Sequence, residues 1–77
     1  MNIKIYSTPT CPYCVQAKQY FKEKNIAFED IDVSLDRNKA QEMIDLSGQM
    51  GVPIIKIDDK VITGFDVDEI EKALKSQ

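Results

Sequence analysis

The 77 residues are enough for one domain, predicted to span 1–77, and 43% hydrophobic with 30% charged residues is typical of a soluble globular protein. The formal net charge is −3, from 10 basic and 13 acidic residues without a basic cluster, which gives no support for binding nucleic acid or an anionic membrane. No stretch approaches the roughly 18 apolar residues of a membrane span, and residues 1–5 alternate in polarity instead of forming an apolar signal sequence. We therefore expect a cytoplasmic protein without a membrane or nucleic-acid partner.

The beginning of the chain favours a strand followed by a helix. Alternating polarity with β-branched and aromatic residues predicts a strand over 3–7. Helical spacing predicts a helix from about 12 to 24, with Asn25 as its stop. The buried face of this helix should contain Cys14, Ala17 and Phe21, with Tyr20 beside them, whereas Lys18, Lys22 and Lys24 should be solvated.

The middle of the chain predicts a second strand and a second helix. The strand is expected over 26–33, with Phe28 in the core and an uncertain register because the alternation breaks near Asp30. Either Ser34 or Asp36 can cap a helix that ends near residue 47, where Gly48 supplies a left-handed C-cap. The inner side of this helix is expected to contain Ala40, Met43, Ile44 and Ser47.

The last third predicts a hairpin and a final helix. Short strands over 54–57 and 61–63 flank a polar turn. The final helix should start with a capping box formed by Asp66 and Glu69, and its buried stripe should contain Val67, Ile70 and Leu74. The order β-α-β-α-β-β-α implies an α/β fold: a parallel pair of strands joined by a crossover helix and closed by a hairpin, with helices on the faces of one sheet.

The chemistry is concentrated in Cys11-Pro12-Tyr13-Cys14, which holds both cysteines of the chain where a strand gives way to a helix. A thiol at a helix start faces unpaired N–H groups and the positive end of the helix dipole, so we expect the pKa of Cys11 to lie below its ordinary value. Pro12 suits the first helical turn, and Cys14 follows nearly one turn later on the same face. A nucleophilic thiol followed by a resolving thiol is a redox device.

Three other interpretations of the two cysteines are weaker. A structural disulfide across one helical turn would close a very small loop and constrain little. Half of a zinc site would lack ligands, since the chain has no further cysteine and no histidine. A metal or cluster bound between two copies of the chain remains an alternative.

The C-P-Y-C motif, together with Gly51-Val52-Pro53 and Gly64-Phe65-Asp66, resembles the glutaredoxins of the thioredoxin superfamily over the full length of the chain. The resemblance implies a four-stranded mixed sheet with helices on both faces. It also implies a cis peptide bond before Pro53, close to the cysteines, and a Val52 backbone that pairs with an extended thiol substrate.

The resemblance further implies a glutathione site. Tyr13 would border the cysteine and glycine of glutathione, next to Val52 and Pro53. Gly64, Phe65 and Asp66 would hold its γ-glutamyl end, because a carboxylate favours a helix N-terminus and an ammonium favours Asp66. Two local alternatives are that Asp66 only caps the last helix and that Phe65 is a core residue beside the site.

The sequence departs from the glutaredoxin pattern at several positions. Thr8 and Gln49 stand where many glutaredoxins have basic residues, and Thr63-Gly64 replaces the usual Gly-Gly. The short chain is also similar to redoxins that supply ribonucleotide reductase and are recharged by thioredoxin reductase, although those tend to have a basic residue in place of Asp66. A cluster carrier bridged by glutathione is disfavoured by Pro12, which cluster-binding relatives mostly lack.

We therefore expect an enzyme, a monomeric dithiol glutaredoxin that reduces protein disulfides and glutathione mixed disulfides. Cys11 would attack as the thiolate and Cys14 would resolve the mixed disulfide. Glutathione would be a co-substrate, with no metal and no tightly bound cofactor. Because the chain has no histidine to act as a base, activation must come from the helix end, local N–H groups and Lys18.

Overall fold

The computed structural model describes residues 2–75, so residues 1, 76 and 77 of the predicted domain lie outside its described part. The elements occur in the predicted order. They are β1 (Ile3–Ser7), α1 (Pro12–Glu23), β2 (Glu29–Asp32), α2 (Arg37–Ser47), β3 (Ile54–Ile57), β4 (Lys60–Thr63) and α3 (Val67–Lys75).

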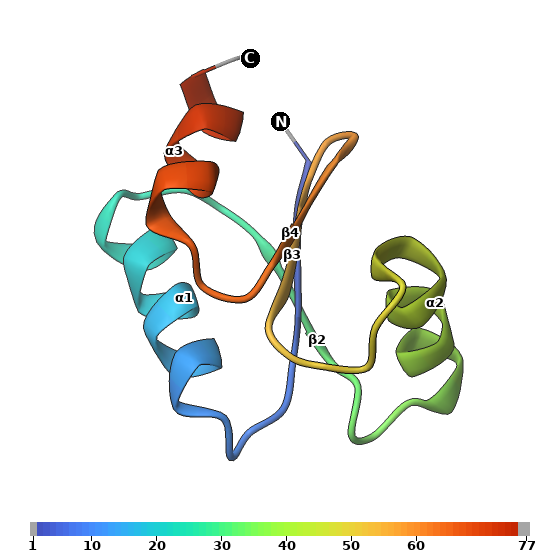
Figure 1. The fold of residues 1–77 in the computed structure, drawn as a ribbon. Coiled ribbons are helices and arrows are strands. Elements are labelled where there is room, and N and C mark those ends of the chain that lie inside the picture. The colour runs from blue at the N-terminus through green and yellow to red at the C-terminus, as the bar shows by residue number, and fades with distance from the viewer. Residues whose placement is uncertain (1, 76–77) are drawn as a thin grey trace.

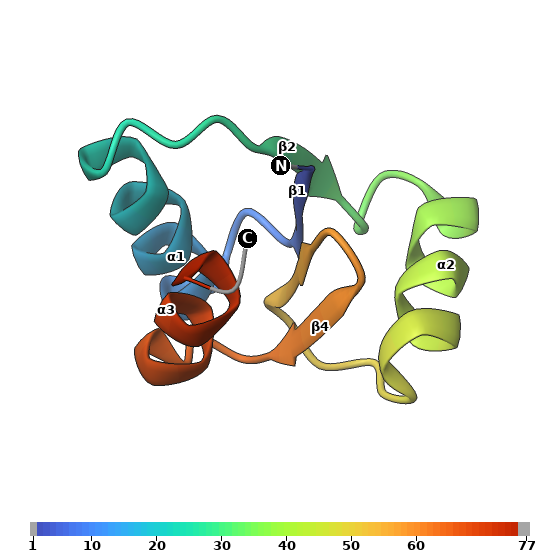
Figure 2. The ribbon, with the colours of Figure 1, turned by 90° about the horizontal axis from the view of Figure 1, so that it is seen from above.

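The four strands form one mixed sheet in the order β2-β1-β3-β4. β1 and β2 are parallel, which requires the crossover through α1, whereas β3 is antiparallel to both β1 and β4. Figures 1 and 2 show α1 and α3 together on one face of the sheet and α2 alone on the other. The predicted α/β architecture, a four-stranded mixed sheet with helices on both faces, is confirmed.

Each face of the sheet has its own hydrophobic core because side chains alternate along the strands. The core under α2 contains Tyr6, Ile31, Met43 and Ile54. The core under α1 and α3 contains Ile3, Ile5, Ala17, Phe21, Ile55, Ile57, Ile62, Ile70 and Ala73. The two cores fix the central strands β1 and β3, whose ends carry the loops of the candidate site.

The second strand is shorter than predicted and covers only 29–32. Its pairing with β1 starts at Lys4 and Glu29, and residues 26–28 lie outside the register of the two strands. Phe28 nevertheless packs against the core under α1 and α3, while Ile31 enters the core under α2.

A helix cap and a turn determine where α2 and β4 begin. Asp36, and not Ser34, caps α2, since its carboxylate accepts hydrogen bonds from the N–H groups of Asn38 and Lys39 at 2.9 and 3.2 Å. The hairpin turns through Asp58, which adopts a left-handed φ of 51°, and β4 therefore starts one residue before the predicted position.

The last helix has the predicted cap but a different buried face. The carboxylate of Asp66 accepts a hydrogen bond from the backbone N–H of Glu69 at 3.3 Å. Ile70 is buried as expected, whereas Val67 and Leu74 are only half-buried. Ala73, which the predicted stripe omits, is buried instead and belongs to the core under α1 and α3.

Candidate active site

Cys11 occupies the N-cap position of α1. Its backbone is extended, with φ of −90° and ψ of 115°, and its Sγ accepts a hydrogen bond from the Cys14 backbone N–H at 3.3 Å. Pro12 provides the first helical residue and has no N–H group that would need a partner. The sulfur of a half-buried cysteine thus takes the place that a serine or aspartate oxygen usually has in a cap.

The environment of Cys11 favours its thiolate. Partial burial raises the pKa of Cys11, but hydrogen bonds from the Cys14 thiol and from the backbone N–H groups of Cys14 and Tyr13 outweigh this effect. The positive charge of Lys18 adds to them, and the pKa of Cys11 lies below its ordinary value. The expected activation is therefore present in the geometry of the helix end.

Cys14 has the opposite character. It is fully buried on the inner face of α1, and burial together with its hydrogen bond to Cys11 raises the pKa of Cys14 to about 11. At neutral pH the pair therefore consists of one accessible, acidic thiol and one buried, protonated thiol that donates to it. This asymmetry suits a nucleophile and a resolving residue.

The loop before β3 lies against the nucleophile. The thiol of Cys11 lies 3.8 Å from the carbonyl oxygen of Val52, and the Val52–Pro53 peptide bond is cis as expected. Pro53 is buried, and its carbonyl oxygen accepts a hydrogen bond from the Gly64 N–H at 2.8 Å. The structure thus places Val52 against the sulfur of Cys11, and a backbone hydrogen bond joins the neighbouring Pro53 to Gly64.

The residues before α3 have clear structural roles. Gly64 adopts a left-handed φ of 80°, which glycine allows without strain. Phe65 is half-buried and its ring meets the edge of the Tyr20 ring, with centroids 5.9 Å apart. Asp66 is exposed apart from its capping bond. Both local alternatives, Phe65 as a core residue and Asp66 as a cap, are present in the structure and leave a ligand role for Asp66 open.

The rim of the site is largely uncharged. Tyr13 is 62% exposed and Met50, just before Gly51, is 78% exposed. Thr8 is half-buried and Gln49 is exposed, so neither position brings a cation to Cys11. The only acidic residue among the predicted site positions is Asp66.

The prediction that the Lys18 side chain is solvated is wrong. Its side chain is only 20% exposed, because its ammonium group pairs with the Asp30 carboxylate at 3.0 Å. The same carboxylate oxygen accepts a hydrogen bond from the buried Ser7 hydroxyl at 3.2 Å. The sequence analysis named Lys18 as a residue that activates Cys11, but it missed Ser7 and Asp30. The signal that Lys18 belongs near the cysteines was its spacing of four residues from Cys14, which places both on one helical face.

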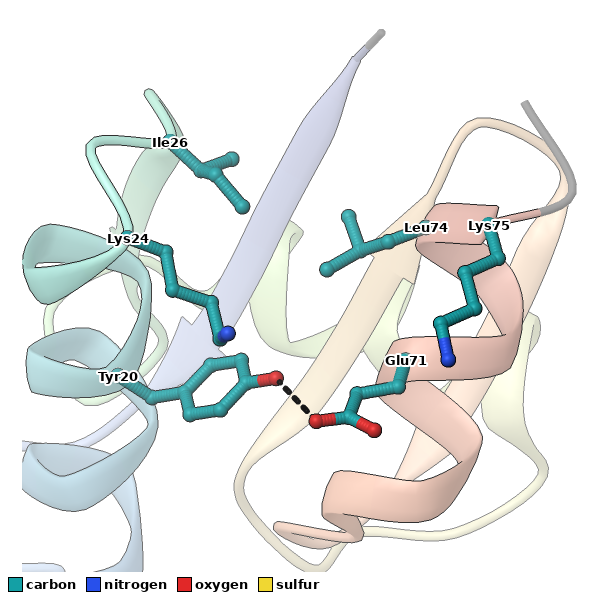
Figure 3. Close-up of a pocket in the computed structure, with 6 residues that line it drawn as sticks. All are labelled: Tyr20, Lys24, Ile26, Glu71, Leu74 and Lys75. Carbon is teal, nitrogen blue, oxygen red and sulfur yellow. Dashed lines mark hydrogen bonds between the residues drawn. The ribbon is translucent and has the colours of Figure 1, made fainter.

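A cavity lies at the end of α1 that is away from the cysteines. It has a volume of about 480 Å³ and lies between the carboxyl-terminal halves of α1 and α3 (Figure 3). Inside it the Tyr20 hydroxyl donates a hydrogen bond to the Glu71 carboxylate at 3.4 Å, and Lys24 lies over the Tyr20 ring. None of the predicted site residues lines this cavity, and the hydrogen bond between Tyr20 and Glu71 joins α1 to α3 there.

The part of the chain that the structure describes, residues 2–75, has neither a metal-binding cluster nor a membrane-spanning helix. No cluster of three or more His, Cys, Asp or Glu side chains in this range has an arrangement that could hold a metal ion. None of the described helices is long and apolar enough to cross a membrane.

The family model described as Glutaredoxin matches residues 3–62, a range that contains the cysteine pair and the Val52–Pro53 segment. The chain belongs to the glutaredoxin family. It is 52% identical over 73 residues to a glutaredoxin-like 8.6 kDa protein encoded in the rubredoxin operon of Clostridium pasteurianum, covering 95% of this chain and 97% of that relative. It is 40% identical over 65 residues to glutaredoxin 3 of Escherichia coli K12, covering 84% and 78%.

A solved structure of a glutaredoxin-like protein has the same fold as this chain. The NrdH-redoxin of Escherichia coli, described as a glutaredoxin-like protein with a thioredoxin-like activity profile, superimposes with a TM-score of 0.84. It is 26% identical, and the match covers 94% of this glutaredoxin and 93% of that chain. The protein is therefore a glutaredoxin-like redox protein with a thioredoxin-like fold.

Proposed function

We propose that this glutaredoxin is a cytoplasmic, monomeric thiol–disulfide oxidoreductase that reduces protein disulfides and glutathione mixed disulfides with glutathione as reductant. The observation that supports it most directly is the asymmetry of the dithiol. Cys11 is accessible and its pKa is lowered, whereas Cys14 is buried within hydrogen-bond distance and its pKa is raised to about 11.

The chemistry follows from this asymmetry. The Cys11 thiolate attacks one sulfur of a substrate disulfide, forms a mixed disulfide and releases the other sulfur as a thiol. Cys14 then loses its proton and attacks Cys11, which releases the reduced substrate and leaves a Cys11–Cys14 disulfide. Two glutathione molecules reduce this disulfide and leave as oxidised glutathione. With a glutathionylated substrate, Cys11 takes the glutathione and a second glutathione frees it.

Glutathione would lie across the predicted site positions around Cys11, among which Asp66 is the only charged side chain apart from the cysteines. Its cysteine would pair with the Val52 backbone beside Pro53, and Tyr13 would border its cysteine and glycine. The γ-glutamyl end would contact Gly64, Phe65 and the exposed carboxylate of Asp66, which suits an ammonium group. No metal and no tightly bound cofactor takes part.

A redoxin recharged by thioredoxin reductase and supplying ribonucleotide reductase is the second candidate. It is favoured by the similarity to NrdH-redoxin and by the absence of a basic side chain at Thr8 and Gln49, which leaves the glycine carboxylate of glutathione without these cationic partners.

One assay compares the two candidates. Turnover of a small glutathione mixed disulfide would be followed with two recharging systems, glutathione with glutathione reductase and NADPH, or thioredoxin reductase with NADPH. We expect turnover with glutathione. Turnover with thioredoxin reductase alone would overturn the proposal in favour of the redoxin.

A further inference from the structure

Lys18 has an unusual position for a lysine on a short surface helix. It follows Cys14 by four residues on α1, and only 20% of its side chain is exposed. A lysine side chain normally extends so that its strongly hydrated ammonium group stays in water. Here the ammonium instead pairs with Asp30 on β2, and Lys18 lies one helical turn after Cys14.

Two residues from neighbouring strands hold it there. Asp30 on β2 pairs with the Lys18 ammonium at 3.0 Å. Ser7, the last residue of β1 and fully buried, donates a hydrogen bond from its hydroxyl to the same Asp30 oxygen at 3.2 Å. Because Ser7 leads directly into the loop that ends at Cys11, this anchor is tied to the backbone that carries the nucleophile.

Among the described residues, Lys18 is the charged side chain that acts on the dithiol. The positive charge of Lys18 on α1 acts on both thiols: it adds to the hydrogen bonds that lower the pKa of Cys11, and it offsets part of the rise that burial causes in the pKa of Cys14. Asp30 faces Lys18 from β2, and Ser7 is the polar group from β1. Lys22 is the next lysine along α1 and is exposed.

We propose that Lys18 stabilises the thiolate first on Cys11 and then on Cys14, and that Asp30 and Ser7 are positioning residues that hold the Lys18 ammonium in place for this role. This inference rests on the proposed dithiol mechanism and assigns the group that assists its second step. When Cys11 is bonded to a substrate sulfur it is neutral, so the positive charge then favours the Cys14 thiolate alone.

The assisted step is balanced. The Cys14 thiolate attacks the Cys11 sulfur of the mixed disulfide, the new Cys11–Cys14 bond forms, and the bond to the substrate sulfur breaks. The substrate leaves as a thiolate and is reduced by two electrons, which the two cysteines supply. The proton of the Cys14 thiol passes to solvent or to the leaving thiolate, and Lys18 remains protonated throughout.

The first test isolates Cys14. In a Cys11→Ser background, alkylation of Cys14 by iodoacetamide is measured against pH, and the midpoint of the profile reports the thiolate independently of access. We expect Lys18→Met to move the midpoint to higher pH and to slow alkylation at neutral pH roughly fivefold to tenfold, as expected for losing one partly screened charge. Lys18→Gln is measured in parallel in case the methionine variant folds poorly, and Lys18→Arg should retain most of the effect.

The matched control is Lys22→Met, which removes the same charge one turn further along α1 and should change the rate less than twofold, as a screened surface charge does. Asp30→Asn decides the positioning role. If Asp30 holds Lys18 in place, the midpoint moves to higher pH, whereas an anion acting only through space would move it to lower pH when removed. A midpoint that is lower or unchanged in Asp30→Asn, or a Lys18→Met effect no larger than that of Lys22→Met, overturns the proposal.

The second test follows the assisted step itself in the protein with both cysteines. Cys11 is loaded with thionitrobenzoate, and attack by Cys14 releases this chromophore. We expect release to be several-fold slower in Lys18→Met than in Lys22→Met, and equal rates would contradict the assignment. Neither test contains glutathione, so a failure here is distinct from a failure of the proposed reductant.

Discussion

The hydroxyl group of Tyr6 donates a hydrogen bond to the carboxylate of Glu42, which joins the central strand β1 to α2. Burial, followed by the contact with Glu42, raises the pKa of Tyr6, and the bond from Tyr6 lowers the pKa of Glu42. The α2 face has a small core, so this polar contact is well placed to fix how α2 sits on the sheet.

The contribution of the Tyr6–Glu42 contact to the free energy of unfolding should depend on pH. Because the pKa of Glu42 is lower in the folded state, its contribution is full above the ordinary value of about 4.5 and is lost as the pH falls through the folded-state pKa. Because the pKa of Tyr6 is raised, its contribution is full below the ordinary value of about 10 and is lost as the pH rises beyond it.

Tyr6→Phe should therefore lower the free energy of unfolding by about 1 kcal/mol at pH 7, a discounted value because Glu42 is partly exposed. Denaturant unfolding at several pH values would measure it, and the difference from the wild type should shrink below pH 4. Glu42→Gln, which keeps an acceptor oxygen without the charge, should flatten the acid dependence. A Tyr6→Phe difference that stays constant down to pH 2 would contradict this explanation.

Replacing Cys11 and replacing Cys14 should impair different activities. Cys11→Ser should abolish thiol exchange, since only Cys11 combines access with a lowered pKa. Cys14→Ser should still remove glutathione from small substrates, which needs one thiol, but should reduce protein disulfides poorly. Both variants would be assayed on both substrates, and exchange retained by Cys11→Ser but lost by Cys14→Ser would reverse the assignment.

The acidity of Cys11 should depend on the Cys14 side chain. Burial opposes ionisation of Cys11, and the hydrogen bond from the Cys14 thiol is the first of the interactions that lower its pKa. Cys14→Ala should therefore move the alkylation profile of Cys11 to higher pH, whereas Cys14→Ser retains a donor and should move it less. Coincident profiles for the alanine variant and the wild type would show that the backbone N–H groups suffice.

A substitution at Asp66 should distinguish its role in binding glutathione from its role as a helix cap. Its carboxylate caps α3 through the Glu69 N–H, and asparagine caps about as well without the charge. Asp66→Asn should thus fold normally but need roughly tenfold more glutathione, the factor expected for losing one charge-assisted contact with the ammonium group. Exchange of Cys11 with a disulfide that lacks glutathione should be unchanged.

The decisive measurement is the glutathione concentration that gives half-maximal turnover, compared with thermal unfolding of the same variant. If Asp66→Asn leaves the glutathione dependence unaltered, Asp66 is only a cap, and recharging by thioredoxin reductase becomes the better explanation.

The amino-acid sequence by itself determined the order of the elements, the faces of α1 and α2 and the redox pair. These features depend on residues close together in the chain. The spacing of Cys14, Ala17 and Phe21 marks one side of a helix, and a cysteine before Pro12 is already at a helix start. The cis bond at Val52–Pro53 was expected only through the family resemblance, because local chemistry alone favours trans.

Only the tertiary structure decided what depends on distant partners. β2 starts at Glu29 because β1 is its neighbour from there on, and Ala73 is buried because α3 lies against the sheet at that point. The helical pattern predicted a solvated Lys18, but in the folded chain Lys18 pairs with Asp30 on β2, and Asp30 accepts a hydrogen bond from Ser7 on β1. A periodic pattern reports which side of an element is apolar, but the partner of a charged side chain is chosen by the packing of the whole fold.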